Sequence, residues 1–275
     1  VCAQSGYRVH LHDVKPKVLE KAEKGMQWSV NKLAEKGFLQ ENPDTVLNRL
    51  RYETDLSCAA DADWIIEAVL EVEALKIDLF KSLEGEIPVT TPLATNTSSI
   101  PITRIASHLK RPERMLGLHF FGPVPFMGLV EVVKGEQTAD HVFEAGVDFI
   151  TSLGKTPVRV NRDIPGFVMN RIFSAAFREA VDLVSDGIVS PEDVDAGMRL
   201  GYGWNVGPFE VADNAGLDTF ALVGQSMADL GEEHLETKSD LLLKMIAQGR
   251  LGKKAGKGFY RYTKDGKRIP YGEEI

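Results

Sequence analysis

Cysteine is scarce in this sequence, and no long apolar run occurs. Only Cys2 and Cys58 are found among 275 residues, without a CxxC pair, which excludes a disulfide framework and predicts a reducing, cytoplasmic compartment. No apolar run reaches the length of a membrane span and no signal peptide is recognisable, so no membrane partner is expected. The formal net charge of -8 at pH 7 disfavours nucleic acid or an anionic membrane as the main partner. It is compatible with a local basic patch for one small anion.

The glycine-rich dinucleotide-binding motif GxGxxG is also missing. Its usual companion is present, because Asp13 ends a predicted strand over residues 7–13 and precedes a predicted helix. In a dinucleotide-binding βαβ unit such an acid holds the ribose hydroxyls and follows the glycine turn by about 20 residues. The first strand and the turn would therefore precede Val1. An acid here favours NAD over NADP; the alternative is that Asp13 is an ordinary helix N-cap.

A metal site is not predicted either. His10 and His12 share one face of this first predicted strand, but no third ligand lies nearby in the sequence. Structural metal sites need about four ligands at suitable spacing.

Predicted strands and helices alternate up to about residue 161, and mainly helices follow. Strands are predicted over residues 7–13, 64–69, 92–95, 115–121, 128–133 and 157–160, and helices over 18–37, 75–83, 102–109 and 141–153. Further helices are predicted over 166–185, 190–200, 208–230 and 239–248, with Ser190 and Ser239 as N-caps. The pattern predicts an α/β domain over residues 1–161 and a helical domain over residues 162–275.

The most informative stretch, residues 116–133, reads LGLHFFGPVPFMGLVEVV. Two apolar runs flank a bend rich in Gly and Pro, which is typical of two buried strands. One run carries a single histidine, His119, and the other a single acid, Glu131. Because an unpaired buried charge is costly, the two side chains are expected to meet each other or water. A carboxylate on one imidazole nitrogen would fix the tautomer and leave the other nitrogen as a base. The alternative is a core histidine beside an unrelated acid.

A second group of polar side chains follows another predicted strand. Residues 93–99 read LATNTSS, and loops at the carboxyl ends of strands are where open α/β sheets bind ligands. We expect Ser99 to cap the following helix and Ser98 to work in a site.

Two predicted helices carry further candidates. Asn170 lies early in an apolar helix, where a buried amide needs a partner, and is either a site residue or a structural amide. Lys32 and Lys36 share a helix face with Ser29 nearby, a pattern that by itself is more typical of a solvated charged face.

Together these motifs resemble the L-3-hydroxyacyl-CoA dehydrogenase family. The shared motifs are ATNTSS, HFFGPVP followed by LVEVV, DIPGFVMNR, GPFE (residues 207–210) and GKGFY, and they extend over essentially the whole chain. The resemblance implies NAD-dependent oxidation of L-3-hydroxyacyl-CoA to 3-ketoacyl-CoA, as in fatty-acid β-oxidation or short-chain acyl-CoA metabolism. It also implies a Rossmann-like NAD-binding domain followed by an all-helical domain that forms a homodimer.

The resemblance implies a role for each candidate residue. In the catalytic group, His119 is the base, Glu131 is its acidic partner, and Ser98 and Asn170 contact the substrate oxygen. On the cofactor side the implied residues are Asp13, Glu71, Lys76, Asn96 and Ser98, and on the coenzyme A side they are Ser29 and Lys36. The chain departs from the family pattern at Gly122, where asparagine is usual, and at Gly128, where lysine is frequent.

Two other functions are compatible with the sequence. One is oxidation of a free hydroxy acid or sugar acid on the same scaffold, against which Ser29 and Lys36 argue. The other is a non-catalytic relative that kept the fold, against which argues the joint presence of four residues, His119, Glu131, Ser98 and Asn170.

Overall fold

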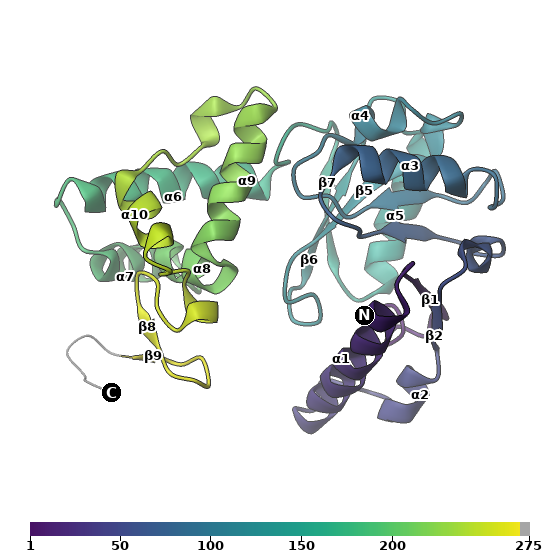
Figure 1. Cartoon of the computed structure of the whole chain (residues 1–275), viewed down its shortest axis with the longest axis horizontal. Coiled ribbons are helices and arrows are strands. Elements are labelled where there is room, and N and C mark those ends of the chain that lie inside the picture. Colours follow the sequence, from purple (N-terminus) through teal and green to yellow (C-terminus); the bar gives the residue numbers. More distant parts are fainter. Residues whose placement is uncertain (270–275) are drawn as a thin grey trace. The chain divides into compact units, whose positions relative to one another are not determined.

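The chain forms two compact units, Val1–Ile164 and Pro165–Ile275, and the computed structural model describes residues 1–269. Strands and helices alternate in the first unit and helices dominate the second (Figure 1). This confirms the predicted class, an α/β domain followed by a helical domain. The division falls three residues after the expected boundary between residues 161 and 162.

A five-stranded sheet forms the centre of the N-terminal unit, in the order β3-β4-β5-β6-β7. Its strands are β3 (Ile65–Glu67), β4 (Leu93–Thr95), β5 (Met115–Phe120), β6 (Leu129–Val133) and β7 (Thr156–Val160). Neighbouring strands are parallel except β5 and β6, which run antiparallel. The antiparallel pair follows from the short Gly- and Pro-containing connection between them, because parallel neighbours need a long crossover.

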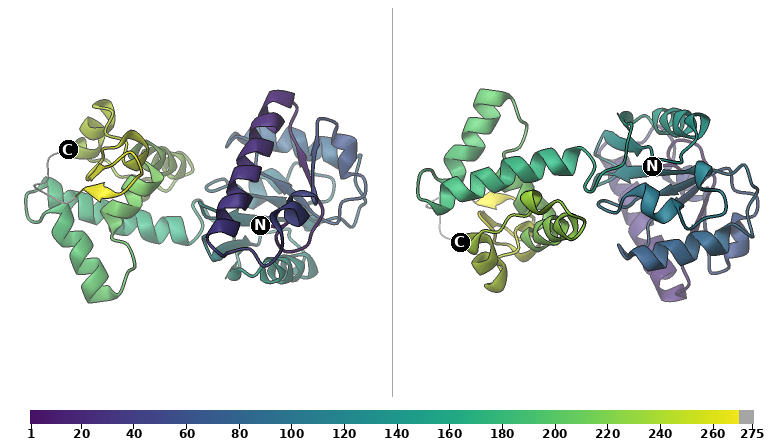
Figure 2. Two further views of the ribbon diagram at one scale, coloured as in Figure 1. Left: turned by 90° about the horizontal axis from the view of Figure 1, so that it is seen from below. Right: turned by 90° about the horizontal axis from the view of Figure 1, so that it is seen from above.

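Helices cover both faces of this sheet. They are α3 (Glu73–Leu83), α4 (Ile102–Ala106) and α5 (Asp140–Ser152), with short 3-10 turns at Leu56–Ala59 and Pro112–Arg114. Helices α3 and α5 lie on opposite faces (Figure 2). The core beneath α5 contains Leu116, Leu118, Val130, Val132, Phe143 and Ile150. Since successive strand residues point to opposite faces, His119 and Glu131 project from the face away from α5.

A second, two-stranded parallel sheet joins β1 (Val9–His12) to β2 (Leu50–Glu53). It packs with α1 (Pro16–Glu35) and α2 (Pro43–Leu47) around a small core of Ala3, Val30, Val46 and Leu50. Helix α1 starts with Pro16 in its first turn and stops before Gly37, which adopts φ +73°, as predicted. Strand β2 and helix α2 were not predicted.

The C-terminal unit contains α6 (Met169–Ser185), α7 (Pro191–Tyr202), α8 (Pro208–Ala215), α9 (Leu217–Asp229) and α10 (Asp240–Ala247). Short 3-10 turns at Glu233–Leu235 and Lys253–Ala255 and a hairpin of β8 (Arg261–Tyr262) and β9 (Arg268–Ile269) complete it. The expected single helix over residues 208–230 is wrong, because Gly216 at φ +99° separates α8 from α9. The Ser190 cap is confirmed by a 3.1 Å bond from the Asp193 amide. Ser239 is the N-cap residue of α10 as predicted, although its side chain makes no capping bond.

Two buried carboxylates explain two of the shared motifs. Asp195 accepts the amides of Phe209 and Glu210 at 2.9 and 3.0 Å, so GPFE is a helix start capped from α7. Asp213 accepts the amides of Phe259 and Tyr260, both at 2.9 Å, and so holds GKGFY. Burial raises the pKa of Asp213 despite these bonds. Both motifs therefore organise the core of this unit.

Candidate active site

His119 and Glu131 face each other across the antiparallel strands β5 and β6. They occupy paired positions in the register, and His119 Nδ1 lies 2.7 Å from Glu131 Oε2. His119 is 5% exposed and Glu131 0%. A carboxylate only accepts hydrogen bonds, so the Nδ1 hydrogen is donated to Glu131 and the ring is held in one tautomer. The Phe121 ring packs against the imidazole, with ring centroids 4.5 Å apart.

Asn96 ties the loop after β4 to the strand that carries His119. Its backbone amide donates to the Glu67 carbonyl at 2.8 Å. Its Oδ1 accepts the Phe120 amide at 2.9 Å. The side-chain oxygen thus accepts a bond from the backbone, and the side-chain nitrogen is the group of Asn96 that would contact a cofactor.

Glu71 organises the small polar loop that follows Asn96. Its Oε1 accepts the Thr97 hydroxyl, and the amides of Ser98 and Ser99 at 3.0 and 3.3 Å. Burial alone would raise the pKa of Glu71, but bonds from Thr97, Lys76 and Ser98 outweigh it and leave that pKa below its ordinary value. The expected Ser99 cap is wrong. Thr97 Oγ1 accepts the amides of residues 99 and 100 instead.

Lys76 is almost completely buried beside this loop. Its ammonium lies 2.8 Å from Glu67 Oε1 and 3.2 Å from Glu71 Oε2. Sequence reasoning missed Glu67, although its signal was present as the single acid inside the apolar run Ile65 to Val69. The structure therefore brings Glu71, Lys76, Asn96 and Ser98 to one edge of the five-stranded sheet.

Asp13 follows the carboxyl end of β1 and is half-buried. Its Oδ1 accepts the Lys15 amide at 2.8 Å and its own amide donates to the Glu53 carbonyl. The alternative that Asp13 caps α1 is wrong, because the residue at the N-cap is Lys15 and no side chain caps that helix.

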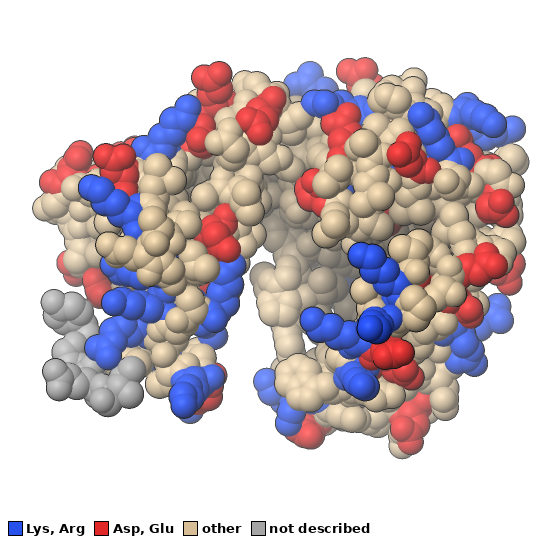
Figure 3. Space-filling model, in the orientation of Figure 1, with Lys and Arg blue, Asp and Glu red and all other residues tan. Residues whose placement is uncertain are grey.

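The end of α1 lies against the loop between β5 and β6. The Lys36 ammonium is 5.6 Å from the ring centroid of Phe126, and the rings of Phe38 and Phe126 meet edge to face. Six lysines stand against three glutamates over residues 15–36, and Lys and Arg side chains gather over α1 in Figure 3. Ser29 is half-buried and Lys36 exposed. This positive stretch is suited to an anionic ligand in a chain that is negative overall.

Asn170 belongs to the C-terminal unit, where it is the second residue of α6 and half-exposed. The expectation of a buried amide that needs a partner therefore does not apply to Asn170.

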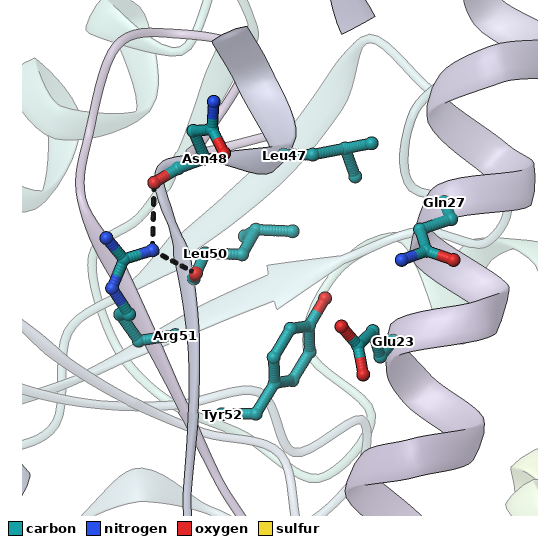
Figure 4. Close-up of a pocket in the computed structure, with 7 residues that line it drawn as sticks. All are labelled: Glu23, Gln27, Leu47, Asn48, Leu50, Arg51 and Tyr52. Atoms are coloured by element: carbon teal, nitrogen blue, oxygen red, sulfur yellow. Dashed lines mark hydrogen bonds between the residues drawn. The ribbon is translucent and has the colours of Figure 1, made fainter. Parts of the chain in front are cut away.

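A shallow hollow between α1 and β2 contains none of the predicted site residues. It is lined by Glu23, Gln27, Leu47, Asn48, Leu50, Arg51 and Tyr52 (Figure 4). Tyr52 points from β2 toward Glu23, and burial together with this carboxylate raises the pKa of Tyr52. Among the described residues, no helix combines the length and apolar character that a membrane span requires.

Comparison with known proteins covers both units. The profile of the 3-hydroxyacyl-CoA dehydrogenase NAD binding domain matches residues 1–164, and that of the 3-hydroxyacyl-CoA dehydrogenase C-terminal domain matches residues 166–262. A probable 3-hydroxybutyryl-CoA dehydrogenase of Deinococcus radiodurans is 43% identical over 263 residues, which are 95% of this chain and 94% of that protein. The human mitochondrial hydroxyacyl-coenzyme A dehydrogenase is 40% identical over 95% of this chain and 86% of its own length. The crystal structure of (S)-3-hydroxybutyryl-CoA dehydrogenase from Ralstonia eutropha superposes with a TM-score of 0.87 at 36% identity, covering 96% of this chain and 93% of that one.

Proposed function

Because the chain belongs to the 3-hydroxyacyl-CoA dehydrogenase family, we propose that its catalytic base is His119 held by Glu131. The enzyme is an NAD-dependent oxidoreductase that converts L-3-hydroxyacyl-CoA to 3-ketoacyl-CoA, reversibly. The observation that carries the catalytic assignment is the 2.7 Å contact between the buried His119 and Glu131 side chains.

The pair divides the proton transfer between two atoms of one ring. With Nδ1 bound to Glu131, Nε2 is the nitrogen that takes the proton of the substrate's C3 hydroxyl. The ring then becomes an imidazolium, whose charge the adjacent carboxylate stabilises. NAD, when bound, supplies the acceptor for the hydride that leaves C3. General acid–base catalysis of this kind contributes roughly 10²- to 10⁴-fold.

The substrate oxygen needs donors close to this ring. Ser98 is the proposed donor from the N-terminal unit, because Glu71 fixes its backbone amide at 3.0 Å. Asn170 is proposed as a second donor on the strength of the DIPGFVMNR motif. Such preorganised donors contribute most when charge develops in the transition state.

The residues present fit NAD as the cofactor. Asp13, Glu71 and Asn96 each follow the carboxyl end of a parallel strand, where dinucleotides bind in open α/β sheets. We propose Asp13 for the adenosine ribose, and Glu71, Lys76, Asn96 and Ser98 for the other half of the cofactor. A carboxylate at Asp13 would repel the 2′-phosphate of NADP.

Coenzyme A is the proposed carrier of the acyl group. Its phosphates suit the lysine-rich α1, and Ser29 and Lys36 are the proposed contacts. A free hydroxy acid carries a single carboxylate, fewer negative charges than the phosphates of coenzyme A, and so fits this lysine-rich helix less well.

Turnover of matched substrates and variants tests these assignments. With NAD, we expect L-3-hydroxybutyryl-CoA to be oxidised with a kcat/KM at least about 100-fold above that of its D isomer and of free L-3-hydroxybutyrate. His119→Gln should lower kcat by roughly 10²- to 10⁴-fold. His108→Gln is the matched control, since that exposed ring contacts only surface groups. Equal turnover of the free acid would refute coenzyme A as carrier, and an active His119→Gln would refute the base.

Self-association is proposed for the helical unit. Ile188, Leu200, Tyr202 and Leu222 are 67–89% exposed, and such apolar exposure is typical of an interaction surface. Sedimentation should give a homodimer that Leu200→Glu weakens; a wild-type monomer would contradict the proposal.

A cytoplasmic location is also proposed. The free cysteines Cys2 and Cys58 support it.

A further inference from the structure

An unusually well-buried ion pair lies at the carboxyl end of β3. The side chains of Glu67 and Lys76 are 0% and 1% exposed, and their charged atoms are 2.8 Å apart. Burying such a pair commonly costs more than an apolar pair of equal volume would. Every further contact of Glu67 points to the same edge: Oε1 accepts the Val69 amide at 2.6 Å and Oε2 the Thr95 hydroxyl at 2.7 Å.

Two routes lead from Glu67 to the proposed site. Along the first, Lys76 also contacts Glu71 at 3.2 Å, and Glu71 binds the Ser98 amide at 3.0 Å. Along the second, the Glu67 carbonyl accepts a bond from the backbone amide of Asn96. The side-chain oxygen of Asn96 in turn accepts the backbone amide of Phe120, the residue that follows His119.

Glu84 shows what a purely structural acid in this unit looks like. Its side chain is 6% exposed and follows the C-terminal end of α3. It accepts the amides of Lys110 and Arg111, both at 3.0 Å. None of the proposed site residues is among these contacts, whereas those of Glu67 lead to the loop that carries them.

We propose that Glu67 is a positioning residue for the dehydrogenase reaction. Its carboxylate anchors Thr95 and Lys76 and thereby fixes the loop that presents Asn96 and Ser98. The proposal rests on the proposed function of that loop. A displacement of about 1 Å in such a loop can cost roughly 100-fold in rate, so the effect belongs in kcat and in cofactor affinity, beyond any loss of stability.

Glu67→Gln and Thr95→Val test the proposal, with controls of the same chemistry. Glu84→Gln matches the first. Thr91→Val matches the second, because buried Thr91 donates only to the Ala62 carbonyl before β4 begins. Acetoacetyl-CoA reduction and NADH binding are measured well below the unfolding midpoint. We expect Glu67→Gln to lower kcat at least about tenfold and NADH affinity at least about fivefold, and Thr95→Val to lower kcat at least about threefold. The controls should lose stability only.

The proposal is overturned if Glu67→Gln keeps the kcat and NADH affinity of the wild type and only loses stability, as Glu84→Gln does. If Glu67→Gln does not fold, Thr95→Val decides alone, and an unchanged kcat overturns it. A wild type that binds NADH without reducing acetoacetyl-CoA would refute the proposed function. The NADH affinity of Glu67→Gln relative to wild type would then still test the role of Glu67. A wild type that does neither would contradict both.

Discussion

Replacing Glu131 by glutamine removes one charge from a buried pair and keeps its shape. In the proposed oxidation the ring takes up the substrate's proton, so the transition state places a developing imidazolium charge beside Glu131 that the ground state lacks. Two unit charges about 4 Å apart attract by about 4 kcal/mol at an effective dielectric constant of about 20. Losing this attraction corresponds to roughly 1,000-fold in kcat. A glutamine amide that donates to Nδ1 would also select the wrong tautomer.

A double-mutant cycle shows whether the two residues form one unit. We expect Glu131→Gln to lower kcat for L-3-hydroxybutyryl-CoA oxidation by roughly 10²- to 10³-fold, with a smaller change in KM. His119→Ala with Glu131→Gln should be little slower than His119→Ala alone, as for residues that act together. The assay is the gain of NADH absorbance under saturating NAD.

The matched control is Glu144→Gln on α5, where an exposed carboxylate pairs with Arg159. Such surface pairs contribute at most about 1 kcal/mol to stability, and kcat should not change. Single losses that simply multiply in the double variant would refute the coupling between His119 and Glu131.

Three further predictions follow from other parts of the chain. Because Asp13, as the proposed ribose contact, would repel a 2′-phosphate, kcat/KM should be at least about tenfold higher with NAD than with NADP; equal values would remove Asp13 from the cofactor site. At Gly252, φ is +92° and a Cβ would overlap the Asp213 carbonyl, so Gly252→Ala should cost about 3 kcal/mol or more in urea unfolding. Gly249→Ala, also at positive φ but in open space, should cost only about 1 kcal/mol; equal costs would contradict the packing. The lowered pKa of Glu71 means that the folded state binds fewer protons there. Its stabilising effect is thus complete above its ordinary value of 4.5 and is lost as the pH falls through the lowered folded pKa. The stability gap between wild type and Glu71→Gln should therefore narrow in acid; a gap that widens would reverse the sign.

Much of the fold could be predicted because its elements depend on local patterns. The apolar runs around His119 and Glu131 gave strands β5 and β6, and Gly37 gave the end of α1. Helices α8 and α9 were merged because apolar periodicity continues across Gly216, and only its φ of +99° breaks the helix. Strand β2 was missed because Leu50–Glu53 has little pattern of its own and is held by pairing with β1.

The candidate site was partly predictable for a similar reason. His119 and Glu131 stand out as single polar residues in apolar runs, a signal that Glu67 shares within β3. The roles of Ser29, Lys36 and Asn170 rest on the family resemblance, since their local surroundings do not distinguish them. Ser99 was predicted to cap the turn after β4, whereas the hydroxyl of Thr97 accepts the backbone amides there. Which hydroxyl does so depends on the path of the turn, which no local pattern encodes.

A labelled substrate follows the transferred hydride directly. L-3-hydroxybutyryl-CoA deuterated at C3 is oxidised with NAD, and the products are analysed by mass spectrometry. We expect acetoacetyl-CoA without the label and NADH carrying one deuterium, at a rate that His119→Gln lowers at least about 100-fold. Unlabelled NADH, or equal label transfer from free 3-hydroxybutyrate, would contradict a hydroxyacyl-CoA dehydrogenase built around His119 and Glu131.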